Sequence, residues 1–276
     1  MHAPIKAAPI KHKFFTPGVT TLTVIALVGL FFVAWRLLFG LGAVTNLDNQ
    51  YPWGIWIAID VAAGVALAAG GFTMAALVYI FHREEFHEIV RPALLTAMLG
   101  YTFVALAVMF DIGRFYNIYH PLYMWNGNSV LFEVGICVMA YVTTLYIEFV
   151  PIVTERFIGR VKLKGFLARF NSLVDKLLRN VDRIMEKVLF FFIILGVVLS
   201  CLHQSSLGTL MMLAGPKIHP LWQTPVAPLL FLLSAFMVGF PMVIMESLVS
   251  SRSFGLKSEM DLLAKLGRYI GPLLAV

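Results

Sequence analysis

Residues 188–212 read VLFFFIILGVVLSCLHQSSLGTLMM, a stretch without aspartate, glutamate, lysine or arginine. At a rise of about 1.5 Å per residue, a helix of this length exceeds the roughly 30 Å thickness of the hydrocarbon core of a bilayer. The stretch therefore predicts a membrane-spanning helix. Its second half carries His203, Gln204, Ser205 and Ser206, which form an unusually polar patch for a segment in lipid.

The composition of the whole chain makes lipid its expected solvent. Of 276 residues, 60% are hydrophobic and 13% are charged, and the mean hydropathy is +0.86, whereas soluble domains carry about 25% charged residues. The net charge of +6 does not indicate nucleic-acid binding, because the basic residues lie in short loops between apolar stretches. Cys137 and Cys201 lie within predicted spans and lack CxxC spacing, which argues against a disulfide framework or an iron–sulfur site in this chain.

Apolar stretches recur along the chain and predict an all-α integral membrane protein built as a polytopic helix bundle. The six predicted spans cover residues 19–39, 53–81, 92–112, 129–153, 188–212 and 226–249. A seventh begins near Leu262, is broken by Gly271 and Pro272 and is cut off at Val276, so we expect it to be too short to cross. Residues 18–276 are thus expected to form one transmembrane domain, preceded by a polar tail at 1–17.

Lysine and arginine predict the orientation of the spans. The tail and every second loop hold most of the basic residues, nine of them between Arg156 and Lys187. By the positive-inside rule these segments face the cytoplasm, so we expect a bacterial inner-membrane protein with a cytoplasmic N-terminus and aromatic loops on the periplasmic side. Residues at about 160–185 place apolar side chains at helical spacing, which predicts an amphipathic helix lying on the cytoplasmic leaflet.

Ionisable side chains inside predicted spans carry the functional signal, because each costs several kcal/mol in lipid unless it meets a partner or a water-filled cavity. They are Asp60, Tyr101, Asp111, Glu133, Glu148, His203 and Glu246. Glu133 and Glu148 are fifteen residues apart, so they project from nearly the same helix face about 22 Å apart along the axis. We expect Glu246 at the depth of Glu148. The pattern indicates a proton route, and the alternative is that each carboxyl group is a buried structural hydrogen-bonding group.

Histidine placement bears on cofactors. Membrane cytochromes hold haem with histidines deep in their helices, and here only His203 lies inside a predicted span. We therefore expect no haem, and for want of clustered ligands no metal, in this chain. The patch at His203 and Gln204 can instead hydrogen-bond a quinone carbonyl, and the histidine can exchange the accompanying proton. The alternative is a structural histidine whose hydrogen bonds are satisfied in the core.

Several segments together resemble one family, the NrfD/PsrC polysulfide-reductase-like membrane subunits, and most closely the HybB branch of respiratory nickel–iron hydrogenases. The matching segments are FGLG at 39–42, YPWGIWIAID at 51–60, RPALL at 91–95, DIGRFYN at 111–117, NSVLFE at 128–133, EF at 148–149, HQSSLG at 203–208 and HPLWQ at 219–223. They run through nearly all of the chain after the first span.

The resemblance implies two four-helix bundles without haem, the second incomplete in this chain. It implies a subunit, not catalytic alone, that passes electrons between a periplasmic ferredoxin-like iron–sulfur partner, with a hydrogenase or other redox subunit beyond it, and menaquinone or ubiquinone. It assigns proton transfer to Tyr101, Glu133, Glu148 and Glu246. It assigns quinone binding to Asp60, Asp111, Arg114, His203 and Gln204.

Two other functions remain open on the sequence alone. A proton-coupled secondary transporter could use the same acidic residues, although such proteins often have broken helices in paired repeats, and the sequence shows no clear paired break. A passive membrane anchor of a redox complex would need none of the carboxyl groups.

Overall fold

The computed structural model describes residues 15–51, 53, 54 and 56–275. The described chain is helical and includes six helical segments long and apolar enough to cross a membrane. They span Pro17–Phe39, Ile59–Ile80, Glu84–Asp111, Val130–Phe157, Ala168–Leu213 and Ala227–Phe254. Each overlaps one predicted span, so the expected polytopic helical membrane protein is confirmed. The lysines of the predicted tail lie outside the described residues.

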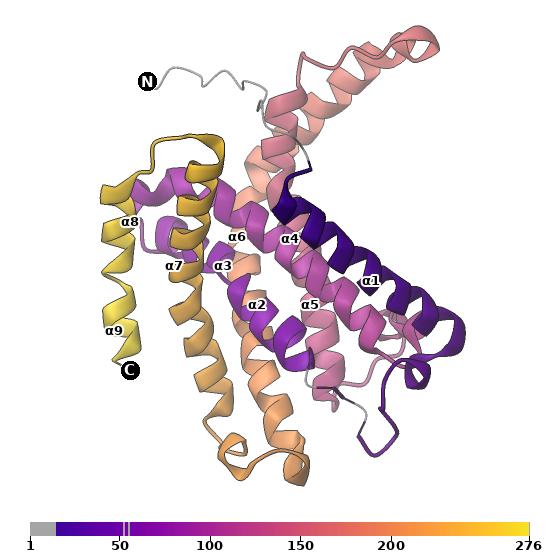
Figure 1. The fold of residues 1–276 in the computed structure, drawn as a ribbon. Helices are drawn as coiled ribbons and strands as arrows, with labels where there is room; N and C mark the ends of the chain where they lie inside the picture. Colours follow the sequence, from indigo (N-terminus) through magenta and orange to yellow (C-terminus); the bar gives the residue numbers. More distant parts are fainter. Residues whose placement is uncertain (1–14, 52, 55, 276) are drawn as a thin grey trace.

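The described chain contains five long helices (Figure 1). They are α1 (Pro17–Phe39), α4 (His87–Asp111), α5 (Val130–Phe157), α6 (Asn171–Leu213) and α7 (Ala227–Phe254). Helix α5 packs along α6, and α6 packs along α7. Two shorter helices, α8 (Met260–Gly267) and α9 (Ile270–Leu274), pack against α7.

The second span lies at the centre of the bundle and is interrupted. Short helices α2 (Gly64–Leu67) and α3 (Gly70–Ala75) are separated at Ala68–Ala69, and π-helical turns at Ala58–Ala63 and Ala76–Ile80 flank them. Two thirds of its apolar window is buried, against 6% for α1. Small residues permit this central position. A Cβ on Gly71 would lie 2.4 Å from the Ala97 Cβ, so α3 touches α4 almost backbone to backbone.

The break in the second span was not predicted. The small residues of this stretch are uniformly apolar, and a hydropathy pattern does not distinguish a continuous helix from one interrupted by a turn. The other five long apolar segments among the described residues contain no comparable interruption within their main helices. The structure therefore has one broken span and, in the part of the chain it describes, no paired break of the kind common in transporters.

The amphipathic segment expected at about 160–185 is mostly helical and is continuous with the fifth span. Residues Gly165–Phe170 form a 3-10 helix, and from Asn171 the chain continues in one helix, α6, through the fifth span to Leu213. The projecting end of α6 and its connection to α5 stand away from the rest of the bundle in Figure 1. The apolar positions at helical spacing thus belong mainly to an extension of a membrane span.

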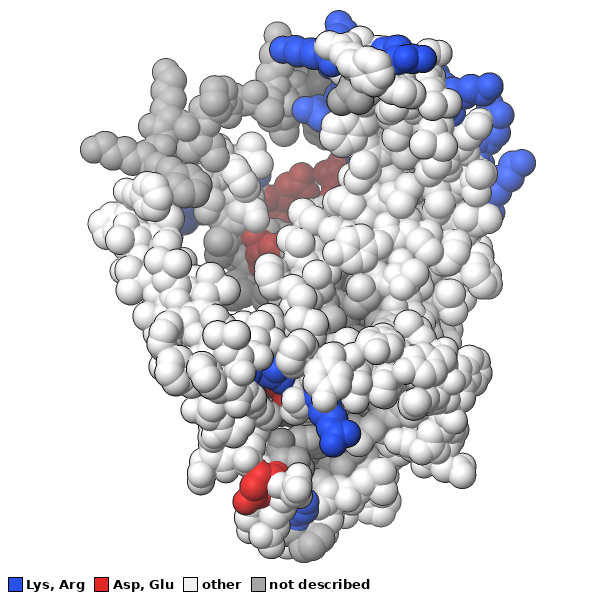
Figure 2. Space-filling model, turned by 90° about the vertical axis from the view of Figure 1, so that its right-hand side faces the viewer, with Lys and Arg blue, Asp and Glu red and all other residues white. Residues whose placement is uncertain are grey.

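Charge is distributed as expected for a chain surrounded by lipid. In Figure 2, lysine and arginine gather at the end where the α5–α6 connection projects, above a broad band almost free of charge. Acidic atoms within this band appear in a hollow. The protein is a multi-pass integral membrane protein.

Candidate functional site

A hydrogen-bonded pair of side chains, Tyr101 and His203, lies at the centre of the bundle. The Tyr101 hydroxyl is 2.6 Å from His203 Nε2, and both residues are fully buried. His203 Nδ1 lies 2.8 Å from the Leu199 carbonyl oxygen, which can only accept. Nδ1 therefore carries the proton, and in the neutral ring Nε2 accepts from Tyr101.

Gln204 connects this pair to a pocket. Its amide nitrogen donates to the Val65 carbonyl at 3.3 Å and to the Tyr101 hydroxyl at 3.4 Å. The same residue lines a cavity of about 520 Å³, which we call the Gln204 pocket. The other lining residues are Ala62, Ala66, Leu221, Trp222, Thr224, Ala227, Leu230, Phe231 and Ser234. The walls are thus largely apolar, with one amide backed by a buried phenol and imidazole.

Two buried hydroxyl groups lie on the other side of the pair. The Tyr141 ring stands edge-on to Tyr101, with centroids 4.6 Å apart, yet its hydroxyl has no hydrogen-bond partner among the described residues. Ser200 Oγ is near both tyrosine hydroxyls but also lacks a partner with hydrogen-bond geometry in the described chain. Buried polar atoms without partners are uncommon and often mark sites of ordered water.

Two of the carboxyl groups of α5, those of Glu133 and Glu148, lie at either end of this row. Ser206 donates to Glu133 Oε1 at 2.6 Å, which joins α6 to α5 near the Gln204 end. Glu148 is buried on the opposite side, where Gly196 leaves it room: a Cβ at Gly196 would lie 2.5 Å from Glu148 Oε1. A polar row therefore follows the α5–α6 interface between the two glutamates.

A second polar cluster lies at the far end of the second span. Trp56 Nε1 donates to Asp111 Oδ1 at 2.8 Å, and the Asp60 and Asp111 carboxyl groups face one another within hydrogen-bonding reach. Arg36 of α1 is close enough to Asp111 to interact with its charge. The cluster thus joins α1, α4 and the start of the second span.

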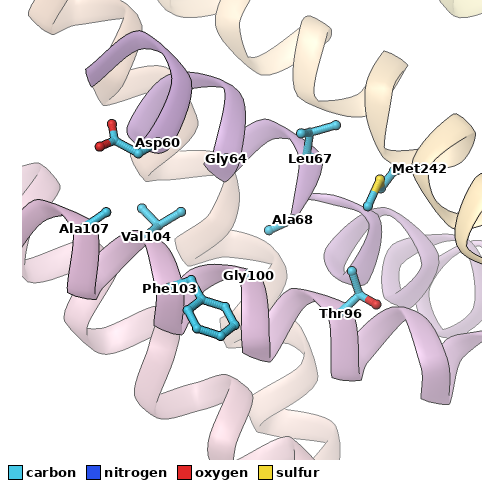
Figure 3. Close-up of a pocket in the computed structure, with 10 residues that line it drawn as sticks. All are labelled: Asp60, Gly64, Leu67, Ala68, Thr96, Gly100, Phe103, Val104, Ala107 and Met242. Atoms are coloured by element: carbon cyan, nitrogen blue, oxygen red, sulfur yellow. The ribbon is translucent and has the colours of Figure 1, made fainter. Parts of the chain in front are cut away.

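Asp60 also lines a second cavity, of about 350 Å³, which we call the Asp60 pocket. Figure 3 shows Asp60 at one end, with Thr96 of α4 and Met242 of α7 toward the other. Thr96 in turn donates a hydrogen bond to the Glu246 carboxylate. Gly64 and Ala68 of the second span face this pocket, whereas Ala62 and Ala66 face the Gln204 pocket, so the same span separates the two.

The structure divides the predicted quinone region. His203 and Gln204 lie together with Tyr101, while Asp60 and Asp111 lie across the second span. Arg114 is in neither group: it is exposed, at the start of a short 3-10 helix. An exposed side chain can direct its charge into water, so proximity to Asp111 in sequence does not bring Arg114 into the cluster.

Sequence reasoning missed Arg36, Tyr141 and Ser200 as members of these groups, and it placed Ser206 in the polar patch without predicting its bond to Glu133. A signal existed for Arg36, because an arginine inside an apolar span must find partners. The hydroxyl groups carried no such signal, since tyrosine and serine are tolerated in membrane helices without a special role.

The sequence model of the family described as "Polysulphide reductase, NrfD" matches residues 43–275. The chain belongs to the NrfD family. The match covers all residues of both pockets and of both polar clusters except Arg36, which lies in α1 before the match begins. The resemblance identified from the sequence motifs is therefore confirmed.

Curated relatives of this NrfD chain are membrane subunits of respiratory oxidoreductases. The "Probable Ni/Fe-hydrogenase 2 b-type cytochrome subunit" of Escherichia coli K12 is 39% identical over 97% of this chain and 65% of its own length. The "Menaquinone reductase, integral membrane subunit" of Nitratidesulfovibrio vulgaris Hildenborough is 34% identical over 64% of this chain and 39% of its own length. A selenate reductase subunit of Mesobacillus selenatarsenatis is 29% identical over 55% of this chain and 35% of its own length. The chain thus spans less than two thirds of each of these relatives.

The expectation of no haem is contradicted by these comparisons. The Escherichia coli relative is named a b-type cytochrome subunit, and b-type cytochromes carry haem. The buried His203 of this NrfD chain does not fit haem ligation as arranged, because both of its ring nitrogens are engaged by Tyr101 and Leu199. No group of three or more potential metal ligands occurs among these described residues. No step of the function proposed below runs through haem.

Proposed function

We propose that this chain is a quinone-reactive membrane subunit of a respiratory oxidoreductase of the hydrogenase type. It passes electrons between an iron–sulfur partner on the periplasmic face and a membrane quinone, with coupled proton transfer. Its N-terminus lies in the cytoplasm, and its spans lie in the bacterial inner membrane. The observation that carries the proposal is the Gln204 pocket, whose single amide is backed by the buried Tyr101–His203 pair.

The pocket suits a quinone ring in shape and chemistry. A quinone is a flat apolar ring with two carbonyl acceptors, and sites for such ligands are apolar cavities of about 300–1,000 Å³ with a few polar groups. Trp222 and Phe231 supply aromatic walls. Both N–H groups of Gln204 are engaged by the Val65 carbonyl and the Tyr101 hydroxyl, so the atom of this amide left for a ligand is its carbonyl oxygen, which accepts. This oxygen would accept a hydrogen bond from a hydroxyl group of the reduced quinone, the quinol.

Reduction of a quinone takes up protons as well as electrons, and the polar row along α5 and α6 offers a route for them. It begins at Glu148, passes the unpartnered Ser200 and Tyr141 hydroxyls and reaches the Tyr101–His203 pair. Water between these hydroxyls would complete the connection. Glu133 lies at the other end, hydrogen-bonded to Ser206. With Glu148 on the cytoplasmic side, uptake through it would be electrogenic.

The test is partner-driven quinone reduction and quinone-analogue binding in membranes that contain the whole complex. Gln204→Leu should weaken analogue binding at least tenfold, because the pocket loses its amide and the Tyr101 hydroxyl loses a hydrogen-bond partner. Gln50→Leu is the matched control, since Gln50 is an exposed loop glutamine outside the pocket.

Two results would replace the proposal. If Gln204→Leu and His203→Ala both reduce quinone at the wild-type rate, the chain is a passive anchor in this reaction. If the chain alone moves a solute in liposomes, with protons coupled and without a redox partner, it is a transporter.

A further inference from the structure

Arg36 is the single charged residue of α1 and its one buried side chain. It is 3% exposed although α1 itself is almost uncovered. Its Nε donates to the Phe110 carbonyl at 2.7 Å, and its Nη2 donates to the Ile112 carbonyl. The guanidinium also lies over the Phe115 ring, 5.0 Å from the centroid. Arg36 therefore holds the backbone on both sides of Asp111.

The hydrogen bonds of Asp111 are incomplete as long as both neighbouring acids are ionised. Oδ1 accepts from Trp56, but Oδ2 is buried with no donor among the described residues. The group that faces Asp111 is the Asp60 carboxyl, whose Oδ1 accepts from the Val61 amide at 2.8 Å. A carboxylate cannot donate, so Asp60 can serve Asp111 only when it carries a proton.

We propose that Asp60 and Asp111 share one proton in a hydrogen bond through Asp111 Oδ2, and that Arg36 is the positioning residue whose charge balances the one negative charge of the pair. The net charge of Arg36, Asp60 and Asp111 is then zero. Two facing carboxylates repel one another in a dry site and do not both ionise readily. Two neutral acids would leave the buried guanidinium without a counter-charge, which is also costly.

The charged groups around the pair support this single-proton state. Arg36 faces it from α1, Asp111 belongs to α4, and Asp60 and the neutral Trp56 donor come from the start of the second span. The shared proton lies at the wall of the Asp60 pocket, because one of the two acids, Asp60, lines this pocket. It is therefore available to a proton acceptor that enters this pocket, on the side of the second span away from Gln204.

This inference goes beyond the proposed quinone site, because it concerns the protonation of the resting protein and can be tested without any quinone reduction. The measurement is the infrared absorption of protonated carboxyl C=O groups in membranes containing the complex, at neutral pH. Asp60→Asn should remove the band of one acid, and its amide can still donate to Asp111. Asp111→Asn should remove the same band, because Asp60 then ionises to balance Arg36.

Non-additivity is the signature of a shared proton. The double variant should lose no more band area than either single variant. Arg36→Gln should add the area of one acid, because the pair then takes a second proton, whereas Arg36→Lys should retain the wild-type area. Arg114→Gln is the matched control and should leave the spectrum unchanged, since Arg114 is exposed three residues from Asp111.

Three results would overturn the inference. They are a double variant that loses twice the area of a single variant, single variants that lose nothing, and an Arg36→Gln spectrum identical to that of Arg114→Gln. If Arg36→Gln does not accumulate in membranes, the asparagine variants decide alone. A failed quinone assay at Gln204 leaves all these readings intact, so the two proposals fail separately.

Discussion

The two pockets lie on opposite faces of the same interrupted span, yet they are built from different chemistry. The Gln204 pocket is backed by neutral groups that hydrogen-bond one another, namely an amide, a phenol and an imidazole. The Asp60 pocket ends on a pair of acids next to a buried arginine. Neutral hydrogen-bonding groups suit recognition of a polar ring substituent, whereas a charged cluster suits holding a proton. The comparison shows how one span can keep the two tasks apart.

The largest expected effect comes from a substitution that pushes the second span away from α4, because this span forms a wall of both pockets. Gly71→Leu would place a side chain where even a Cβ lies 2.4 Å from Ala97. We expect a loss of about 3 kcal/mol or more in the free energy of unfolding, and loss of both pockets, measured as thermal stability in detergent. Gly29→Leu is the control, because a Cβ there meets nothing within 4 Å. Equal stability of the two variants would contradict the close packing of α3 and α4.

His203→Ala should affect one pocket and spare the other. It leaves the Tyr101 hydroxyl without its 2.6 Å partner, and removal of a proton-exchanging group should lower quinone reduction about 1,000-fold. The infrared band of the Asp60–Asp111 pair should not change. A His203→Ala variant that altered this band would show that the second span does not insulate the two clusters.

Glu148→Gln tests the other end of the polar row. The amide keeps the shape beside Gly196 but cannot carry a proton, so proton uptake during quinone reduction should slow roughly 100-fold. Stopped-flow measurement with a pH-sensitive dye in proteoliposomes would detect the change. Glu155→Gln is the control, because that glutamate pairs with Arg91 at the surface. Equal slowing in both variants would remove Glu148 from the route.

The smallest expected effect is that of Tyr141→Phe. The ring packing against Tyr101 is retained, and the hydroxyl lost has no partner in the described chain, so the free energy of unfolding should change by less than about 1 kcal/mol. Proton uptake should still slow severalfold if water bridges this hydroxyl to Ser200. Unchanged uptake would mean that the row passes Ser200 alone.

The spans were predictable from the sequence, because hydropathy and helix rise depend on local spacing. Which helix faces which was not. Glu148 and Glu246 were expected at one depth, yet Glu246 bonds Thr96 beside the Asp60 pocket while Glu148 sits against Gly196. Such contacts depend on how each helix is rotated about its own axis and on which helices are adjacent. The spacing of residues within one helix gives neither.

The same limit explains the errors at the candidate site. Asp111 and Arg114 are close in sequence, and this suggested a joint role, but the side chains that meet Asp111 are Trp56 and Asp60, some fifty residues earlier. The nearby arginine is Arg36 of α1, which bonds the backbone on both sides of Asp111. His203 and Gln204 were predicted because four polar residues in a row are conspicuous in lipid. The haem expectation failed for another reason: it rested on counting histidines, which says nothing of what relatives of the chain carry.

Helix α6 runs for 43 residues, which corresponds to about 65 Å, roughly twice the hydrocarbon thickness of a membrane. The same uninterrupted rod carries the projecting end near the α5–α6 connection and the Gln204 amide. Because the helix is continuous, rotation of its projecting end about the helix axis would also rotate the Gln204 amide, toward or away from the pocket wall.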